Sequence, residues 1–281
     1  MLSLRQRNSI AFTALLISTA GFMALGAGSA AGADIVIDEF SHVDIFENPW
    51  PYKQSSPGGG PDIFEVVADG VIQGDAGRIR ETNIRLLGFD SPKDHAEMGV
   101  ETTTGTFDHT ATAGVANILQ FSYGFIIQND LNADLSETIG LRIDLADLQP
   151  DAGGYLQMSA RIGDGSGVIS ESGLVFEAEP GPHSVLLSFA DFDAAGVVNL
   201  ADIGAIEISF YATSGTDFSI ERLVAAQPIP GDTNADAVVD MADFMAVIAA
   251  WGDCTGCSED LDDDGLVGII DLLIVLANWG Q

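Results

Sequence analysis

The stretch Ile206-Glu207-Ile208-Ser209-Phe210 alternates between apolar and polar side chains at every step. Successive side chains of a β-strand point to opposite faces, so this pattern predicts a strand with one buried face and one wet face. Leu141-Arg142-Ile143-Asp144-Leu145 has the same pattern earlier in the chain. Strands that are wet on one side are typical of antiparallel sheets. The two stretches therefore predict an antiparallel β fold.

Other apolar or alternating runs extend this prediction over residues 34–226. They lie at residues 35–37, 63–68, 79–87, 118–127, 139–145, 155–162, 174–177, 184–189, 205–211 and 218–223. Turn-forming segments such as Pro57-Gly58-Gly59-Gly60-Pro61 and Gly163-Asp164-Gly165 separate the runs. About ten strands without a long helical period predict a mainly β protein, an antiparallel β-sandwich of jelly-roll type.

The first 33 residues have the three parts of a secretory signal peptide. Arg5 and Arg7 give a positive start, residues 10–25 are mostly apolar, and Ala31-Gly32-Ala33 offers a small-residue cleavage site. Polar residues interrupt the apolar run, which disfavours the alternative of a membrane anchor. We therefore expect a secreted, extracytoplasmic protein that begins at Asp34 and does not insert into a membrane.

The chain is strongly acidic. Its formal net charge is −32, from 42 acidic and 10 basic residues, and no basic residue follows Arg222. Such a chain repels nucleic-acid phosphates and anionic lipid headgroups. Neither nucleic acid nor membrane is therefore expected as a partner.

A proline-containing linker at residues 227–230 leads from the predicted sandwich to a smaller domain at residues 231–281. The smaller domain contains an acidic segment twice, at residues 232–243 and 260–271, and an apolar segment follows each copy. The two copies are 28 residues apart both from Asp232 to Asp260 and from Trp251 to Trp279. The constant offset indicates a repeat.

Both acidic segments place oxygen-bearing groups where a calcium-binding loop needs its ligands, at loop positions 1, 3, 5, 7, 9 and 12. The predicted ligands are Asp232, Asn234, Asp236, the carbonyl of Val238, Asp240 and Asp243 in the first loop, and Asp260, Asp262, Asp264, the carbonyl of Leu266 and Asp271 in the second. Gly268 stands at position 9 of the second loop, so a water takes that place. The alternative, two solvated loops without ions, is disfavoured by repulsion among the clustered carboxylates. We therefore expect calcium as a cofactor, with two ions bound.

Each loop leads into a segment with apolar residues at helical spacing. The predicted apolar faces are Phe244, Val247, Ile248 and Trp251 in the first helix and Leu272, Val275, Leu276 and Trp279 in the second. Gly252 and Gly280 follow where each helix is expected to end. Val239 and Val267, the eighth residues of the loops, are expected to join the loops through a short backbone bridge.

The two cysteines, Cys254 and Cys257, lie between the repeats with Gly256 in the turn. A zinc site is disfavoured because two thiolates fill only half of a tetrahedron. A redox pair is disfavoured because no helix N-terminus is present to lower a thiol pKa. In an oxidising compartment, the pair is expected to form a local disulfide.

The repeats resemble the type I dockerin module, which consists of two loop-helix repeats related to the EF-hand. The resemblance covers residues 231–281 and depends on D-x-N-x-D-x-x-V-D-x-x-D at 232–243 and D-x-D-x-D-G-x-V-G-x-x-D at 260–271. It implies one calcium ion per repeat, calcium-dependent folding and a protein partner of the cohesin type. Met241-Ala242 and Ile269-Ile270 depart from the often polar partner-selecting pairs of that family, so the partner's identity stays open.

The larger part of the chain carries no nucleophile elbow, zinc-protease, P-loop or dinucleotide-binding motif. The four histidines, His42, His95, His109 and His183, are scattered and are expected on the surface or in loops. Glu39, Glu65 and Glu207 are possible acid-base groups, but nothing selects a catalytic pair among so many acids.

Trp50 and Tyr52, in a proline-rich loop, are the candidates for stacking on a sugar ring, with burial at the end of the sandwich as the alternative. The run from Ile35 to Phe40 and the segment Leu200-Ala201-Asp202-Ile203 loosely resemble galactose-binding-like, carbohydrate-binding sandwiches. We therefore expect a non-catalytic binding and anchoring protein, possible carbohydrate ligands included. The alternatives are a polysaccharide-active glycoside hydrolase and a structural coat or matrix component.

Overall fold

The structure is a computed structural model of the chain. It describes residues 34–40, 52–54, 62–67, 79–88, 95–101, 104–125, 131–193, 197–234, 236, 238–254 and 256–280. The predicted signal peptide at residues 1–33 lies outside the described residues.

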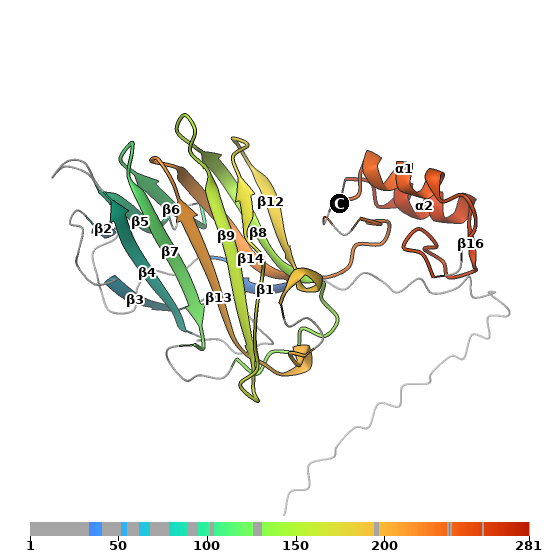
Figure 1. The fold of residues 1–281 in the computed structure, drawn as a ribbon, viewed down its shortest axis with the longest axis horizontal. Helices are drawn as coiled ribbons and strands as arrows, with labels where there is room; N and C mark the ends of the chain where they lie inside the picture. The colour runs from blue at the N-terminus through green and yellow to red at the C-terminus, as the bar shows by residue number, and fades with distance from the viewer. Residues whose placement is uncertain are drawn as a thin grey trace, which may run out of the picture. The chain divides into compact units, whose positions relative to one another are not determined.

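Two antiparallel sheets of seven strands each lie face to face and form a β-sandwich (Figure 1). The first sheet has the order β12 (His183–Ser188), β8 (Gly140–Gln149), β14 (Asp217–Ala226), β6 (Thr106–Ala111), β5 (Ala96–Glu101) and β2 (Tyr52–Gln54), and β1 (Ile35–Asp38) also pairs with β14. The second sheet has the order β10 (Ile169–Glu171), β9 (Leu156–Asp164), β13 (Ile203–Ala212), β7 (Ala116–Tyr123), β4 (Ile79–Gly88) and β3 (Asp62–Val67), and β11 (Val175–Glu177) also pairs with β9. The predicted antiparallel sandwich is confirmed.

Consecutive strands often belong to different sheets. From β6 to β9, and again from β12 to β14, each strand lies in the sheet opposite to the strand before it. Two short 3-10 helices, Phe189–Asp191 and Leu200–Asp202, lie in the connection between β12 and β13. This alternation is typical of jelly-roll sandwiches. As a result, the strands that lie side by side in a sheet come from distant parts of the sequence.

The core lies between the sheets and follows the alternation of each strand. Ile206, Ile208 and Phe210 of β13 are fully buried, whereas Glu207 and Ser209 point away from the core. Phe107 and Phe121 meet edge to face inside the core, with ring centroids 4.8 Å apart. Full burial of such a side chain stabilises the fold by about 1.5–3 kcal/mol relative to exposure. The core therefore contains the apolar side chains of each alternating strand, and the polar side chains face outward.

One ion pair lies inside this core. Arg80 pairs with Asp38, and both side chains are fully buried. Tyr123 also donates its hydroxyl to Asp38, at 2.9 Å. The Arg80 guanidinium lies 4.8 Å from the ring centre of Phe40. Although burial acts in the opposite direction, Asp38 holds the pKa of Arg80 above its usual value.

The C-terminal part contains two helices, α1 (Met241–Ala249) and α2 (Ile269–Ala277), and two short paired strands, β15 (Gly252–Asp253) and β16 (Leu266–Val267). Four valines, Val239, Val247, Val267 and Val275, form its buried cluster. Among the described residues, no helix has the length and apolar character that a membrane crossing requires.

The predicted bridge between Val239 and Val267 is wrong. Val267 instead pairs with Gly252, just after α1, and the carbonyl of Val239 accepts a hydrogen bond of 2.9 Å from Gly280, just after α2. Each loop therefore pairs with the segment that follows the helix of the other repeat. This exchange leaves both valines free to pack into the buried cluster.

The predicted helix faces are correct only in part. Val247 and Val275 are buried, and Phe244 and Leu272 pack against the buried cluster. Ile248, Trp251, Leu276 and Trp279 are exposed, by 43% to 54% of each side chain's surface. Two helices of nine residues each bury only the narrow stripe that faces the other helix.

Candidate functional site

A groove of about 550 Å³ runs over the outward face of the second sheet. It is lined by Asn83, Arg85, Leu87, Ile118, Gln120, Gln157, Ser159, Ser209 and Tyr211. These side chains come from β4, β7, β9 and β13, and they belong to the polar half of each alternating strand. The wet face that the sequence predicted is thus the floor of the groove.

Strand register arranges this floor into rows. The central row contains Asn83, Gln120, Ser209 and Ser159, each opposite the next on neighbouring strands. Gln120 donates to the Ser209 hydroxyl at 3.2 Å. The row therefore presents amide and hydroxyl groups, which both donate and accept hydrogen bonds.

A second row, one step along the strands, contains Arg85, Ile118, Tyr211 and Gln157. Phe176 of β11 continues this row opposite Gln157 and is 56% exposed. Tyr155 lies between the two aromatic side chains, with ring centroids 5.6 Å from Phe176 and 6.5 Å from Tyr211. Arg85 is thus at one end of the row and Phe176 at the other, with Tyr211 in the middle.

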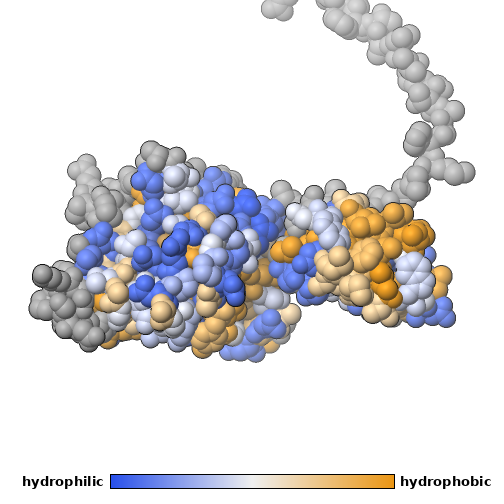
Figure 2. Space-filling model, turned by 90° about the horizontal axis from the view of Figure 1, so that it is seen from above, coloured by the Kyte–Doolittle hydropathy of each residue, from blue (hydrophilic) through white to orange (hydrophobic). Residues whose placement is uncertain are grey.

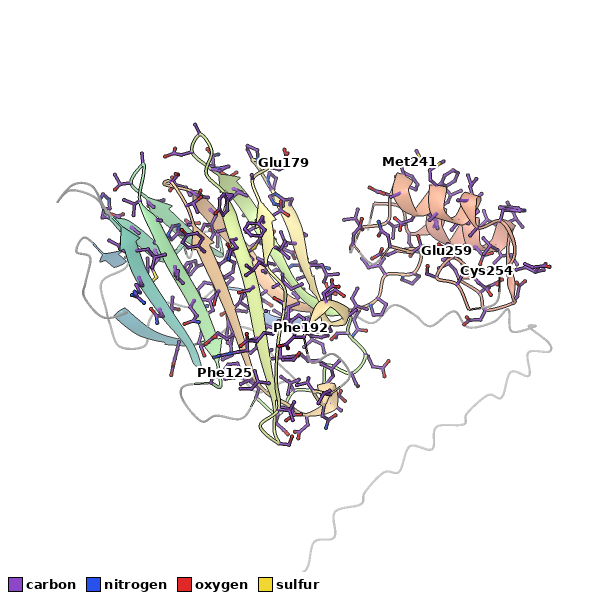
Figure 3. The ribbon with its side chains drawn as sticks, in the orientation of Figure 1. Phe125, Glu179, Phe192, Met241, Cys254 and Glu259 are labelled. Atoms are coloured by element: carbon purple, nitrogen blue, oxygen red, sulfur yellow. A yellow bond between two sulfur atoms is a disulfide. The ribbon has the colours of Figure 1, made fainter. Side chains whose placement is uncertain are left out.

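A smaller hollow of about 220 Å³ continues the groove and shares Ser159 and Ser209 with it. Arg161 lies here, 3.0 Å from Glu207 and 3.9 Å from Glu171. The pKa of Glu207 is raised because burial disfavours its charged form and Glu171 adds repulsion, although Arg161 acts against both. The Arg161 guanidinium lies 4.5 Å from the ring centre of Phe125, which is labelled in Figure 3. Both glutamates are therefore engaged by one arginine.

The stacking candidates from the sequence differ from the aromatic residues of the groove. Trp50 lies outside the described residues, and Tyr52 begins strand β2 of the first sheet rather than lying in a loop. The sequence interpretation missed Tyr211 and Phe176. Alternation places both on outward faces, but only the strand order shows that Tyr211 shares a groove with Gln120 and that Phe176 continues its row.

The histidine prediction is wrong for His109. Its side chain is buried in β6, its Nε2 lies 2.8 Å from the Asn117 carboxamide oxygen, and its ring stacks on Phe218 at 4.6 Å. Burial lowers the pKa of His109 to about 4, although the bond to Asn117 acts in the opposite direction. His95 and His183 are partly exposed, and His42 lies outside the described residues.

The two acidic loops have the same internal hydrogen bonds. Asp236 donates its backbone amide to Asp232 at 3.2 Å, and Asp264 donates to Asp260 at 3.1 Å. The next such bond also recurs, from Val238 to Asp236 at 2.9 Å and from Leu266 to Asp264 at 2.8 Å. The repeat of the sequence is therefore also a repeat of loop geometry.

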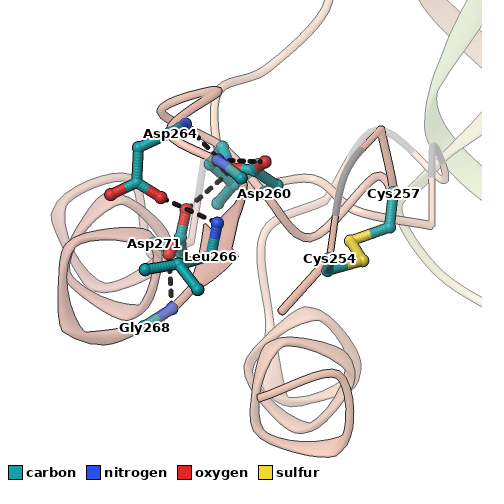
Figure 4. Close-up of a disulfide and its surroundings, with 9 residues drawn as sticks. Cys254, Cys257, Asp260, Asp264, Leu266, Gly268 and Asp271 are labelled. Carbon is teal, nitrogen blue, oxygen red and sulfur yellow. Dashed lines mark hydrogen bonds between the residues drawn. A yellow bond between two sulfur atoms is a disulfide. The ribbon is translucent and has the colours of Figure 1, made fainter. Parts of the chain in front are cut away.

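The last aspartate of each loop is buried and closes its loop, as Figure 4 shows for Asp271 of the second loop. In the second loop, Asp271 accepts amide hydrogen bonds of 2.7 Å from both Leu261 and Gly268. Asp243 accepts the equivalent bonds from Thr233 and Asp240, both at 2.8 Å. Burial raises the pKa of Asp243, but its backbone hydrogen bonds outweigh burial and leave the pKa below its usual value.

The second loop brings three carboxylates together. Oxygen atoms of Asp260, Asp262 and Asp264 all lie within 4.8 Å of one another. Burial and repulsion from Asp264, Asp271 and Asp260 raise the pKa of Asp262. Gly265 has φ = +86°, as the tight curl at the sixth position of such a loop requires. A compact set of hard oxygen donors fits a calcium ion.

Cys254 and Cys257 are joined by a disulfide, so this prediction is confirmed (Figure 4). Cys254 also donates its amide to the Gly265 carbonyl at 3.0 Å. The disulfide therefore lies in the connector that packs against the second loop.

Apolar side chains gather on the surface of the helical segment (Figure 2). Eleven large apolar residues are exposed there, namely Val238, Met241, Met245, Ile248, Trp251, Leu266, Ile269, Ile270, Leu273, Leu276 and Trp279. Met241, at the start of α1, is 58% exposed (Figure 3). Concentrations of this kind on a small segment are typical of protein interaction sites.

No protein-family model and no curated protein matches this chain. Among solved structures, it is similar to the family 11 carbohydrate-binding module of a cellulosomal cellulase of Clostridium thermocellum, at 12% identity and a TM-score of 0.31, over 70% of this chain and 96% of that chain. It is also similar to the family 11 xylanase from Neocallimastix patriciarum, at 11% identity and a TM-score of 0.33, over 61% of this chain and 98% of that chain. The agarase AgWH50C is similar at 12% identity and a TM-score of 0.32, over 59% of this chain and 29% of that chain. At such scores, function has to be argued from the groove and the loops themselves.

Proposed function

We propose that the sandwich binds carbohydrate in the groove on the second sheet. The observation that carries this proposal is the lining of the groove, in which a row of amide and hydroxyl side chains lies beside Tyr211. Amides and hydroxyls match sugar hydroxyls, which are donors and acceptors at once. An aromatic face packs against the apolar face of a sugar ring. The volume of about 550 Å³ also lies within the usual range of ligand sites.

The groove suits a chain of sugars rather than one sugar. The row from Arg85 on β4 to Phe176 on β11 crosses four strand spacings, which makes about 19 Å at about 4.8 Å per spacing. Its floor is partly exposed over β7, β13 and β9, so a ligand has access from the solvent along the whole row. An oligosaccharide or a segment of polysaccharide fits such an open site.

Binding of the full chain to a panel of polysaccharides tests this proposal. We expect Tyr211→Ala and Gln120→Ala each to weaken binding by about fivefold, because each removes a contact worth about 1 kcal/mol. Thr110→Ala, an exposed change in β6 of the first sheet, is the matched control and should bind as the unchanged chain does. Equal binding by all three variants would contradict the proposal. If the chain hydrolyses the bound glycan and Glu207→Gln abolishes this activity, the result would favour a glycoside hydrolase instead.

We also propose that the helical segment binds two calcium ions. The three clustered carboxylates of the second loop support this proposal. Asp260, Asp262, Asp264, the Leu266 carbonyl and Asp271 would hold one ion, and the equivalent residues of the first loop, from Asp232 to Asp243, would hold the other. The ions would neutralise the carboxylates and fix the loops ahead of both helices.

Calcium titration of the full chain, followed by helical circular dichroism, tests the calcium sites. We expect Asp264→Ala to weaken one of two binding events, because it removes a ligand from the three-carboxylate cluster. Glu259→Ala removes an equal charge just before the loop and should leave both events unchanged. No response of the unchanged chain at millimolar calcium would contradict the proposal.

The exposed apolar surface on the helical segment supports a docking role for a calcium-loaded module of a secreted protein. The resemblance to dockerin modules points to a cohesin-like protein partner. This role would be supported if the chain bound a cohesin domain only in the presence of calcium and if Leu273→Gln abolished that binding. Calcium-dependent self-association of the full chain without cohesin binding would favour the structural coat or matrix alternative.

A further inference from the structure

Arg85 differs from the other arginines whose side chains the structure describes. Each of those has an acidic partner: Arg80 pairs with Asp38, Arg142 with Asp34 and Asp144, Arg161 with Glu207, and Arg222 with Asp144. Within the described part of the chain, no acidic side chain forms an ion pair with Arg85. This is notable in a protein with 42 acidic residues and 10 basic ones. On the β7 side, the strand position opposite Arg85 holds Ile118, and Tyr211 of β13 lies beyond it in the same row.

Arg85 is exposed and lines the groove, where it is the one charged residue among the nine lining residues that the structure describes. Its eight companions are amides, hydroxyls, one tyrosine and two aliphatic residues. Among the described acidic residues of the same sheet face, Glu207 and Glu171 lie in the adjoining hollow and are engaged by Arg161, and Glu81 of β4 is buried on the far side of the central row from Arg85. The groove is thus locally positive at its β4 end, although the whole chain is negative.

We propose that the glycan bound in this groove is anionic and places a carboxylate or sulfate group against Arg85. This inference rests on the proposed carbohydrate-binding function. A guanidinium presents two parallel N–H groups that match a carboxylate or a sulfate. The aromatic side chains of the same row, Tyr211 and Phe176, would hold a sugar ring farther along the chain. The ligand class is therefore a uronate-containing or sulfated polysaccharide.

The negative charge of the whole chain opposes such a ligand only at long range. At physiological salt, exposed charges farther apart than about 8 Å are largely screened. The contact with Arg85 is at hydrogen-bond distance and persists under these conditions. Binding is therefore measured at physiological salt.

The test compares glycans that differ only in their charged groups. Polygalacturonate is compared with its carboxyl-reduced polymer, and a sulfated galactan with its desulfated form, by calorimetry on the full chain. We expect one charged glycan to bind about fivefold more tightly than its neutral counterpart, the upper range for an exposed ion pair. Arg85→Gln should remove this preference while the neutral form binds as before. Arg222→Gln, which removes an equal charge from β14 of the first sheet, should keep it.

Each result decides the inference. A preference for the carboxylate arm identifies a uronate, and a preference for the sulfate arm identifies a sulfated sugar. Equal binding of charged and neutral forms, with loss of both in Tyr211→Ala, overturns the inference and leaves carbohydrate binding intact. Equal weakening of both forms by Arg85→Gln overturns it too, because Arg85 would then contact neutral hydroxyls. No binding of any glycan overturns the inference together with the proposed function.

Discussion

Asp38 joins three elements of the sandwich through one carboxylate. Its Oδ1 accepts the amide of Phe40 at 2.9 Å, and its Oδ2 accepts from Arg80 and Tyr123. Arg80 and Tyr123 belong to β4 and β7 of the second sheet, whereas β1, which contains Asp38, belongs to the first. The buried charge of Arg80 would destabilise the fold without the carboxylate of Asp38. Asp38 therefore stabilises the packing of β1 against the second sheet.

We expect Asp38→Asn to lower the free energy of unfolding by about 3 kcal/mol, because the shape is kept while Arg80 loses its counter-ion inside the core. Urea denaturation followed by the β signal of circular dichroism measures this change. Glu179→Gln, an exposed change in a loop, is the control and should shift the midpoint little. An unchanged midpoint in Asp38→Asn would show that Arg80 finds another partner.

His109 makes the stability of the sandwich depend on pH. Its pKa is about 4 in the folded chain and 6.5 without the fold, because burial disfavours the charged ring. Below pH 6.5, His109 of the unfolded chain becomes protonated, whereas His109 of the folded chain stays neutral until about pH 4. The fold therefore loses stability through this window, by roughly 3 kcal/mol in all, and this effect is absent at pH 7.

We expect His109→Gln to be less sensitive to acid than the unchanged chain over the same window, whatever its stability at pH 7. Urea midpoints at pH 7 and pH 4.5 measure the two slopes. His183→Gln removes a partly exposed histidine from β12 and should retain the slope of the unchanged chain. Identical slopes in all three proteins would exclude His109 as the titrating group.

At the scale of elements, strands with a strong alternation were predicted well and mixed strands were missed. β13 and β8 contain the alternating stretches, and both form where expected. β5 (Ala96–Glu101) and β6 (Thr106–Ala111) were missed because β5 mixes alanine and glycine with two glutamates, and β6 mixes alanine with threonines, an aspartate and a histidine. Their strand form depends on pairing with each other and with β14, which a local pattern does not contain.

The two helices of the C-terminal part depend on a close crossing at Gly231. This residue has φ = +97°, and a Cβ there would lie 3.0 Å from the Cα of Val275 in α2. Asp232 and the rest of the first loop follow directly after it. Glycine thus allows the chain to pass over α2 before it enters the loop.

We expect Gly231→Ala to destabilise the helical segment by more than about 1 kcal/mol, because a strained φ adds to the contact with α2. Thermal unfolding of the full chain, followed by the helical signal, measures the loss. Gly256→Ala has a similar positive φ but no atom within 4 Å of the added Cβ, so it isolates the cost of backbone strain. Equal effects of both changes would show that the crossing tolerates a methyl group.

At the scale of the whole molecule, the sandwich and the helical segment each have their own buried cluster. The cluster of the sandwich contains aromatic and large aliphatic side chains from both sheets, and that of the helical segment is built on four valines. The small cluster stabilises its segment weakly, since it buries little apolar area. Bound ions would therefore matter far more to the helices than to the strands.

We expect removal of calcium by a chelator to unfold α1 and α2 and to leave the sandwich folded. In a chain carrying Trp50→Phe, the remaining tryptophans are Trp251 and Trp279, so tryptophan fluorescence reports only on the helical segment. The fluorescence should change with calcium while the urea midpoint of the β signal stays constant. A matching change in both signals would show that the two parts unfold together.

Local pattern alone determined which residues of the alternating strands β8 and β13 are buried, where the acidic loops recur and that Cys254 pairs with Cys257. These features depend on residues that are close in sequence, since strand alternation, the spacing of loop ligands and the two residues between the cysteines all lie within a short stretch of chain. The groove was not predictable in this way. Asn83, Gln120, Ser209 and Ser159 are far apart in the chain and form one row only because β4, β7, β13 and β9 lie side by side. Among the described residues, strand order also places Ile118 rather than an acid beside Arg85, and that placement, which only the tertiary structure decides, gives the groove its positive end.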